Sequence, residues 1–204
     1  MARHSREEAA ASRARILSAT SRSIRAKGIE GTAIPAVMRD AGLTHGSFYA
    51  HFDSKDALVS EACGHAFGRS AAVQEATAAG AGRGEALLAI VRRYLTEAHR
   101  DEPETGCPVP ALAAEVARQP AAVRSAYTKG VEDLLARFER LSPRRARELA
   151  PALLSGIAGA IAIARAVDDP ALSARMLEDT LAFWTRALSR RSLFPQRRGG
   201  PAAT

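Results

Sequence analysis

The side chains that could do chemistry in this sequence are hydrogen-bonding groups gathered between residues 41 and 58. Helical spacing after residue 43 hides the apolar side chains of this stretch and turns small and polar positions outward. These outward positions are His45, Gly46, Ser47 and Tyr49. Presented by a short helix, they can reach the floor or walls of a DNA major groove.

The residues around these positions predict how they are held. Gly42 can adopt the left-handed conformation that a tight turn between two helices requires. Thr44 can then cap the second, short helix, which hides Leu43, Phe48 and Phe52. Together these features predict a helix-turn-helix.

A third helix is predicted directly afterwards. Asp53 can cap its amides, and Asp56 three residues later completes an acidic variant of the capping box. Lys55 lies in the first turn, so amide dipoles and an ammonium group converge where a phosphate could dock.

Residues 13–62 resemble the DNA-binding domain of the TetR family of bacterial transcriptional regulators. The matching positions are Ile16, Gly28, Thr32, Val37, Ala41, Gly42, Leu43, Tyr49, His51, Phe52, Lys55 and Leu58. Ala33, Pro35 and Met38 depart from the family pattern, although proline is tolerated in a first helical turn. The resemblance implies an all-α protein with an N-terminal helix-turn-helix three-helix domain and a C-terminal helical ligand-binding and dimerisation domain.

The resemblance also implies roles for individual residues. Thr44, His45 and Ser47 would lie near base edges, with Tyr49, His51 and Lys55 on phosphates, and Thr32 and Gly46 complete the expected DNA-binding set. Phosphate contacts give affinity and register, whereas base-edge contacts give sequence preference. A homodimer would read a near-palindromic operator in double-stranded DNA.

The composition agrees with a helical protein. The chain has 204 residues, of which 47% are hydrophobic and only 5% aromatic, and alanine is abundant. This composition favours closely packed helices over sheets. No uninterrupted apolar stretch approaches the ~20 residues of a membrane span, and residues 1–8 lack the apolar core of a secretory signal. We therefore expect a cytoplasmic protein without a membrane partner.

The formal net charge of +7 suggests a polyanionic partner, but much of the excess lies at the end of the chain. Residues 186–204 hold five arginines and no acidic residue. Residues 190–204 are expected to be a basic disordered tail that aids solubility; the alternative is a supplementary contact with DNA or a partner.

No catalytic residues, metal site or cofactor are expected. Cys63 and Cys107 are too few for a disulfide framework and form no spaced metal motif with the five histidines. Asp168 and Asp169, beside a proline, are typical of helix capping rather than acid–base catalysis. An enzyme is therefore not predicted.

Hydrophobic periodicity and breakers divide the chain into three parts. Residues 1–56 hold a polar arm and the helix-turn-helix domain, residues 57–189 a helical ligand-binding and dimerisation domain, and residues 190–204 the tail. Helices are predicted over residues 12–27, 55–79, 87–100, 111–118, 120–141 and about 170–189, and over residues 144–167 with Pro151 as a kink or as the true start.

The C-terminal domain is expected to bind a small-molecule effector, because ligands enter this domain in the family that the chain resembles. The candidate pocket residues are Phe67, Tyr94, Tyr127 and Arg165, although each could equally be ordinary core or surface.

Cys107 follows Gly106 in a loop-to-helix junction that resembles one TetR subgroup, some members of which sense electrophiles or oxidants. A thiol near a helix N-terminus can have a lowered pKa. The alternative is a small buried cysteine, and Pro108 removes an amide that could stabilise a thiolate.

The last two helices are expected to pair with those of a second subunit, as they do in the family. The proposed interface residues are Gly156, Gly159, Ala160, Leu177, Leu181, Trp184 and Leu188. The alternative is that these helices only close the core of a single chain. Two functions remain besides an effector-released repressor: a regulator that senses oxidants through Cys107, and a ligand-binding dimer that has lost DNA binding.

Overall fold

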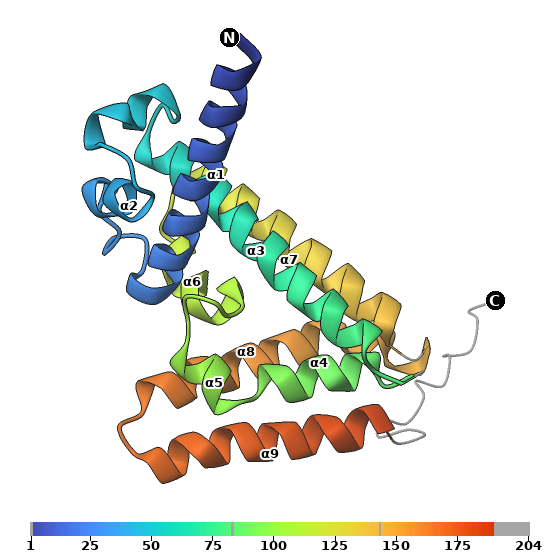
Figure 1. Ribbon diagram of the computed structural model, residues 1–204. Helices are drawn as coiled ribbons and strands as arrows, with labels where there is room; N and C mark the ends of the chain where they lie inside the picture. Colours follow the sequence, from blue (N-terminus) through green and yellow to red (C-terminus); the bar gives the residue numbers. More distant parts are fainter. Residues whose placement is uncertain (1, 83, 143, 190–204) are drawn as a thin grey trace, which may run out of the picture.

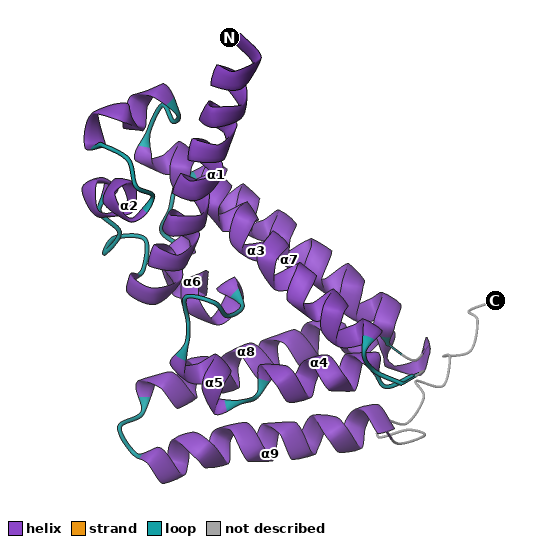
Figure 2. Cartoon of the chain, viewed as in Figure 1, coloured by secondary structure: helices purple, strands orange, loops and turns teal. Residues whose placement is uncertain are grey.

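The computed structural model describes residues 2–82, 84–142 and 144–189, and throughout these ranges the regular elements are helices (Figures 1 and 2). In chain order they are α1 Ala2–Lys27, α2 Ile34–Asp40, the 3-10 helix η1 His45–Ala50, α3 Lys55–Ala79, α4 Ala86–Tyr94, α5 Glu97–Asp101, α6 Pro108–Val116, α7 Ala121–Leu141, the 3-10 helix η2 Arg144–Leu149, α8 Ala150–Ala166 and α9 Pro170–Ser189. The all-α prediction is confirmed. The expected tail, residues 190–204, lies outside the described residues.

The N-terminal head has its own small core. Buried side chains from α1, α2, η1 and the start of α3 form it: Ile16, Ala19, Val37, Met38, Ala41, Phe48, Phe52 and Leu58. Two residues that depart from the family pattern, Pro35 and Met38, leave α2 intact: Pro35 lies in its first turn, and Met38 is buried in the core of the head. The expected polar arm is instead part of α1, which begins at Ala2, because alanine, arginine and glutamate are good helix formers.

The turn between α2 and η1 is a Schellman motif. Gly42 has a φ of 71°, its amide donates to Arg39 O, and the Leu43 amide donates to Met38 O. The prediction for Gly42 is confirmed. Two capping predictions were wrong: Thr44 makes no side-chain cap, and Ser54, not Asp53, caps α3 by accepting the Ala57 amide at 3.0 Å.

The body is built on the long α3 and on α7, which lie side by side in Figure 1, with α4, α8 and α9 packed at one end. Helix α3 matches its predicted bounds and carries the chain from the head into the body. Pro151 marks the start of α8 rather than a kink.

The predicted helix over residues 87–100 is interrupted at Leu95 and Thr96. His99 Nδ1 lies 2.7 Å from the carbonyl oxygen of Tyr94. The Thr96 hydroxyl caps α5 by accepting a hydrogen bond from the His99 amide. The ring thereby satisfies a carbonyl that the end of α4 leaves free, and α5 starts at Glu97 after the Thr96 cap.

One segment of the described chain, Arg147–Ala166, is long and apolar enough to cross a membrane by length and composition alone. This differs from the expectation that no stretch approaches that length. However, 44% of its apolar window is buried, and α8 packs against α5, α6, α7 and α9. Such packing is typical of a core helix, so the segment is weak support for a membrane span.

Candidate DNA-binding surface and effector domain

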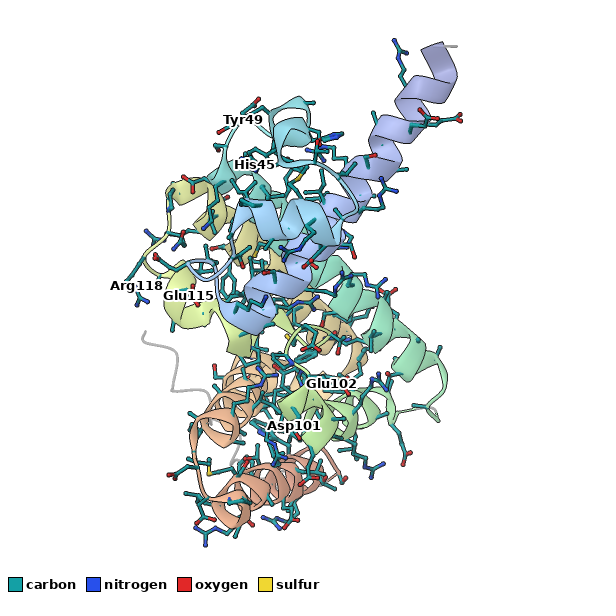
Figure 3. All side chains as sticks on the ribbon, turned by 60° about the vertical axis from the view of Figure 1, so that its left-hand side comes forward. His45, Tyr49, Asp101, Glu102, Glu115 and Arg118 are labelled. Atoms are coloured by element: carbon teal, nitrogen blue, oxygen red, sulfur yellow. The ribbon has the colours of Figure 1, made fainter. Side chains whose placement is uncertain are left out.

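The outward face of η1 is exposed as predicted. Thr44, His45, Gly46 and Tyr49 are exposed, and Ser47 and His51 are half-buried. Tyr49 is 73% exposed, and its ring stands edge-on to buried Phe48 at a centroid distance of 5.1 Å. Figure 3 shows His45 and Tyr49 at the end of the molecule away from Asp101. The head therefore presents a polar surface on a rigid apolar support.

Lys55 begins α3 directly after the Ser54 cap and is half-buried. The first amides of α3 and the Lys55 ammonium are therefore at the same end of the helix, which suits a phosphate oxygen. The Ser47 hydroxyl donates to Thr44 O at 2.7 Å, so it can accept a hydrogen bond from a base but would have to exchange this bond to donate one.

Thr32 does not fit the expected DNA contact. It is only 2% exposed, and its hydroxyl donates to Gly28 O at 2.7 Å and lies 3.0 Å from the Ser23 hydroxyl. Its side chain holds the turn between α1 and α2 instead of facing solvent.

The residues expected to bind a ligand come together in the body. Tyr94, Cys107 and Arg165 interact electrostatically, and Tyr127 packs edge-on to Phe67 at 5.6 Å. Tyr94 and Cys107 are 5% and 3% exposed, so the centre of this cluster is packed. The Tyr94 hydroxyl is buried without a hydrogen-bond partner among the described residues.

His99 connects this cluster to its neighbours and was not predicted from the sequence. Its Nε2 accepts the Cys107 amide at 2.9 Å, and its Nδ1 lies 2.7 Å from Tyr94 O. A carbonyl only accepts and an amide only donates, so the ring is neutral with its proton on Nδ1. Burial lowers the pKa of His99 to about 4, which agrees with this state.

Arg165 of α8 binds the backbone of α5, the helix that carries His99. Its guanidinium donates to His99 O at 2.6 Å and to Arg100 O at 2.7 Å. Burial lowers the pKa of Arg165 from its ordinary value, and nearby Tyr94 and Cys107 oppose this shift. Arg165 therefore ties α8 to α5 rather than pointing into open space.

Neither thiol lies in surroundings that favour a thiolate. Burial raises the pKa of Cys63 to about 11 and also raises the pKa of Cys107. For Cys107, the charge of Arg25 only partly opposes the effect of burial.

Two side chains connect the head to α6 and to the loop before it. Arg25 of α1, only 6% exposed, donates to Gly106 O at 2.6 Å, next to the start of α6. At the other end of α6, Glu115 accepts the Ile29 amide at 2.7 Å. Sequence reasoning missed Arg25 and Glu115, because their partners lie more than eighty residues away and no local pattern marks such pairs.

The residues expected at the dimer interface differ in their exposure. Ala160, Leu177, Trp184 and Leu188 are between 3% and 8% exposed and fill the chain's own core, so they do not fit an interface role. Gly156 packs under the Trp184 indole, whereas Gly159 and Leu181 are half-buried. The large apolar side chains that α8 and α9 expose are Ile163 at 49% and Phe183 at 46%.

Two family models match the chain. Residues 16–62 match the bacterial regulatory proteins of the tetR family, and residues 84–180 match the tetracyclin repressor-like C-terminal domain. No curated protein sequence gives a significant match.

Solved structures agree with this assignment. A TetR-family regulator from Agrobacterium tumefaciens is 18% identical, with 89% of this chain and 100% of that one covered, and a TM-score of 0.74. A TetR-family regulator from Cytophaga hutchinsonii is 23% identical, with 84% of this chain and 93% of that one covered, and a TM-score of 0.70. The reduced form of Escherichia coli NemR is 22% identical, with 84% of this chain and 94% of that one covered, and a TM-score of 0.68. At these identities the structures show a shared fold.

The two matching models span the head and most of the body, including the exposed face of η1 and the helices that pack behind it. The chain therefore belongs to the TetR family of transcriptional regulators, which are DNA-binding proteins and not enzymes.

Proposed function

We propose that the chain is a homodimeric repressor that binds a near-palindromic operator and is released from it by a small-molecule effector, in the cytoplasm. The observation that carries the proposal is the exposed polar face of η1 beside Lys55 at the capped start of α3. His45 is the candidate for reading base edges, and Tyr49, His51 and Lys55 are candidates for phosphates.

Dimerisation is supported by the exposed apolar side chains Ile163 and Phe183 on adjacent helices α8 and α9. Gly159 of α8 supports close approach, because an added Cβ there would meet nothing within 4 Å. A two-fold dimer doubles the number of base contacts and sets the spacing of the two half-sites.

Coupling between body and head is supported by the hydrogen bonds of Arg25 and Glu115, at the two ends of α6. An effector that moves α6 must stretch the bonds from Glu115 to Ile29 and from Arg25 to Gly106, or move the head with it. Helix α3 gives a second connection, because it starts at Lys55 and runs through the body. Release is then a population shift between DNA-competent and incompetent states.

An oxidant-sensing function through Cys107 is less well supported. One of the similar structures is described as a reduced form, but burial and the raised pKa of Cys107 disfavour the reactive thiolate in this chain. The other alternative, a dimer without DNA binding, is tested by the experiment below.

The experiment is selection of bound duplexes from a random DNA pool, followed by gel-shift titration of the selected sequence. Lys55→Gln should weaken binding to all duplexes and lower the slope of log affinity against log salt by about 1 per subunit. His45→Ala should change which sequence is selected. Arg92→Gln, a charge removal at an exposed site of the body, should change neither. Failure of the folded wild type to enrich any duplex would refute the proposal.

A further inference from the structure

A hollow of about 400 Å³ opens along the line where α3 and α7 meet. It is lined by residues of these two helices only, among them Gly64, Phe67 and Gly68 of α3 and Gly130, Leu134 and Arg137 of α7. Its volume falls within the range of small-molecule sites in proteins. Of the residues expected to bind a ligand, Phe67 lines it, whereas Tyr94 and Cys107 lie in the packed core.

Two glycines of α3 are unexplained by packing. Gly64 and Gly68 lie one turn apart, and a Cβ added at either would meet nothing within 4 Å. In a helix interior each costs about 1 kcal/mol relative to alanine. Gly130 differs, because a Cβ there would overlap the Phe67 ring. Gly64 and Gly68 therefore leave space open that no side chain of the described residues fills.

The charges along the hollow favour an anion. Lys129, Arg137 and Arg140 line it, and Asp133 is the one carboxylate among the lining residues. Asp133 pairs with Lys129, and Glu75, beside the hollow, pairs with Arg137. In the part of the chain that the structure describes, no carboxylate pairs with Arg140.

Arg137 is the most enclosed of these cations. Its side chain is 14% exposed. Its Nη1 donates to Gln74 Oε1 at 3.3 Å and its Nη2 forms an ion pair with Glu75 at 3.3 Å, while its buried Nε has no partner among the described residues. Gln74 and Glu75 therefore hold the guanidinium at the hollow, and its Nε–H is left without a hydrogen bond among the described residues.

We propose that this hollow is the effector site and that its ligand is a small organic anion with an aromatic or aliphatic body. The body lies against Phe67 and Leu134 over the open glycines, and the anionic group faces Arg137 and Arg140. This inference rests on the proposed function, since it places that effector. A ligand held between α3 and α7 acts on the helix that begins at Lys55, and so on the head.

The test uses two fluorescent probes of similar shape, the anion 1-anilinonaphthalene-8-sulfonate and its uncharged analogue N-phenyl-1-naphthylamine, with the full chain. The wild type should bind the anion more tightly than the neutral probe. Gly68→Leu, which fills the hollow, should weaken binding of the anion about tenfold or more, because it removes the apolar site. Ala72→Leu is the matched control on an exposed position of the same helix outside the hollow, and it should bind as the wild type does.

Charge is tested separately. Arg140→Gln should weaken binding of the anion about threefold to fivefold and leave binding of the neutral probe unchanged. This size of effect is typical of a partly exposed ion pair, here between Arg140 and the sulfonate. Thermal unfolding of each variant verifies that it is folded, and Gly64→Leu serves in place of Gly68→Leu if the latter does not fold.

The outcomes separate this inference from the proposed function. Wild-type affinity in a folded glycine-to-leucine variant, equal effects of Arg140→Gln on both probes, or no binding of the anion by the wild type would overturn the site. If the same wild-type protein still shifts its selected duplex, the repressor proposal stands. If it binds no duplex, the repressor proposal fails whatever the probes do.

Discussion

The Glu115 carboxylate accepts the backbone amide of Ile29 at 2.7 Å, joining the last turn of α6 to the turn between α1 and α2. The same oxygen lies 3.4 Å from the Glu30 amide. Gly28, with a φ of 78°, leaves the space that the carboxylate occupies, since an added Cβ would overlap it. Figure 3 shows Glu115 close to the base of the head. This contact makes the position of the head depend on α6.

Glu115→Ala should therefore loosen the head from the body. Loss of a hydrogen bond to a charged acceptor should cost about 1.5–3 kcal/mol in the free energy of unfolding, and exchange of the Ile29 amide hydrogen should become faster. Hydrogen exchange and denaturant unfolding measure both effects. Glu132→Ala, at an exposed position of α7, is the control. Unchanged exchange at Ile29 would show that the contact contributes nothing to the coupling.

Replacing either exposed apolar side chain of α8 and α9 with a charge should break the proposed dimer. Ile163→Glu or Phe183→Glu would bury a carboxylate at the interface and should weaken association by about 2 kcal/mol or more. Sedimentation over a range of concentrations gives the monomer fraction. Val73→Glu is the control, because Val73 is similarly exposed at 41% but lies on α3. A wild type that sediments as a monomer would exclude the dimer outright.

His99 should make stability depend on pH. Burial lowers the pKa of His99 from 6.5 to about 4, so between these values the unfolded chain binds a proton that the folded chain does not. Above pH 6.5 the ring is neutral in both states and the free energy of unfolding is at its full value. As the pH falls from 6.5 towards 4, protonation of the unfolded chain lowers the free energy of unfolding by about 3 kcal/mol at most.

The measurement is the free energy of unfolding between pH 4 and pH 7 for the wild type and for His99→Gln, whose amide can replace both hydrogen bonds without titrating. The difference between the two curves should fall as the pH is lowered across this range. Parallel curves would mean that the ring is not buried in its neutral form.

The two thiols should be unreactive in the folded protein. Burial raises the pKa of Cys63 to about 11 and raises that of Cys107, so both remain protonated and shielded at neutral pH. Ellman's reagent should modify neither thiol before unfolding and both afterwards, whereas an Ala72→Cys variant should react at once because Ala72 is exposed. Fast reaction of the native protein that disappears in Cys107→Ser would revive the oxidant-sensing alternative.

The sequence by itself determined the features that depend on neighbouring residues. Gly42, the bounds of α3 and the outward face of η1 follow from backbone preference and helical periodicity, which act over a few residues. The choice of Ser54 over Asp53 as cap was missed, because adjacent residues offer the same oxygen and only the backbone path selects one.

Only the tertiary structure decided what depends on residues that are distant in the chain. A wide apolar stripe on α9 did not reveal that Leu177 and Trp184 face the chain's own core while Phe183 faces outward. The break after Tyr94 and the bond from Glu115 to Ile29 likewise depend on packing in three dimensions. Periodicity shows that a residue needs a partner, but the partner is chosen by how the helices pack, and this information is not local.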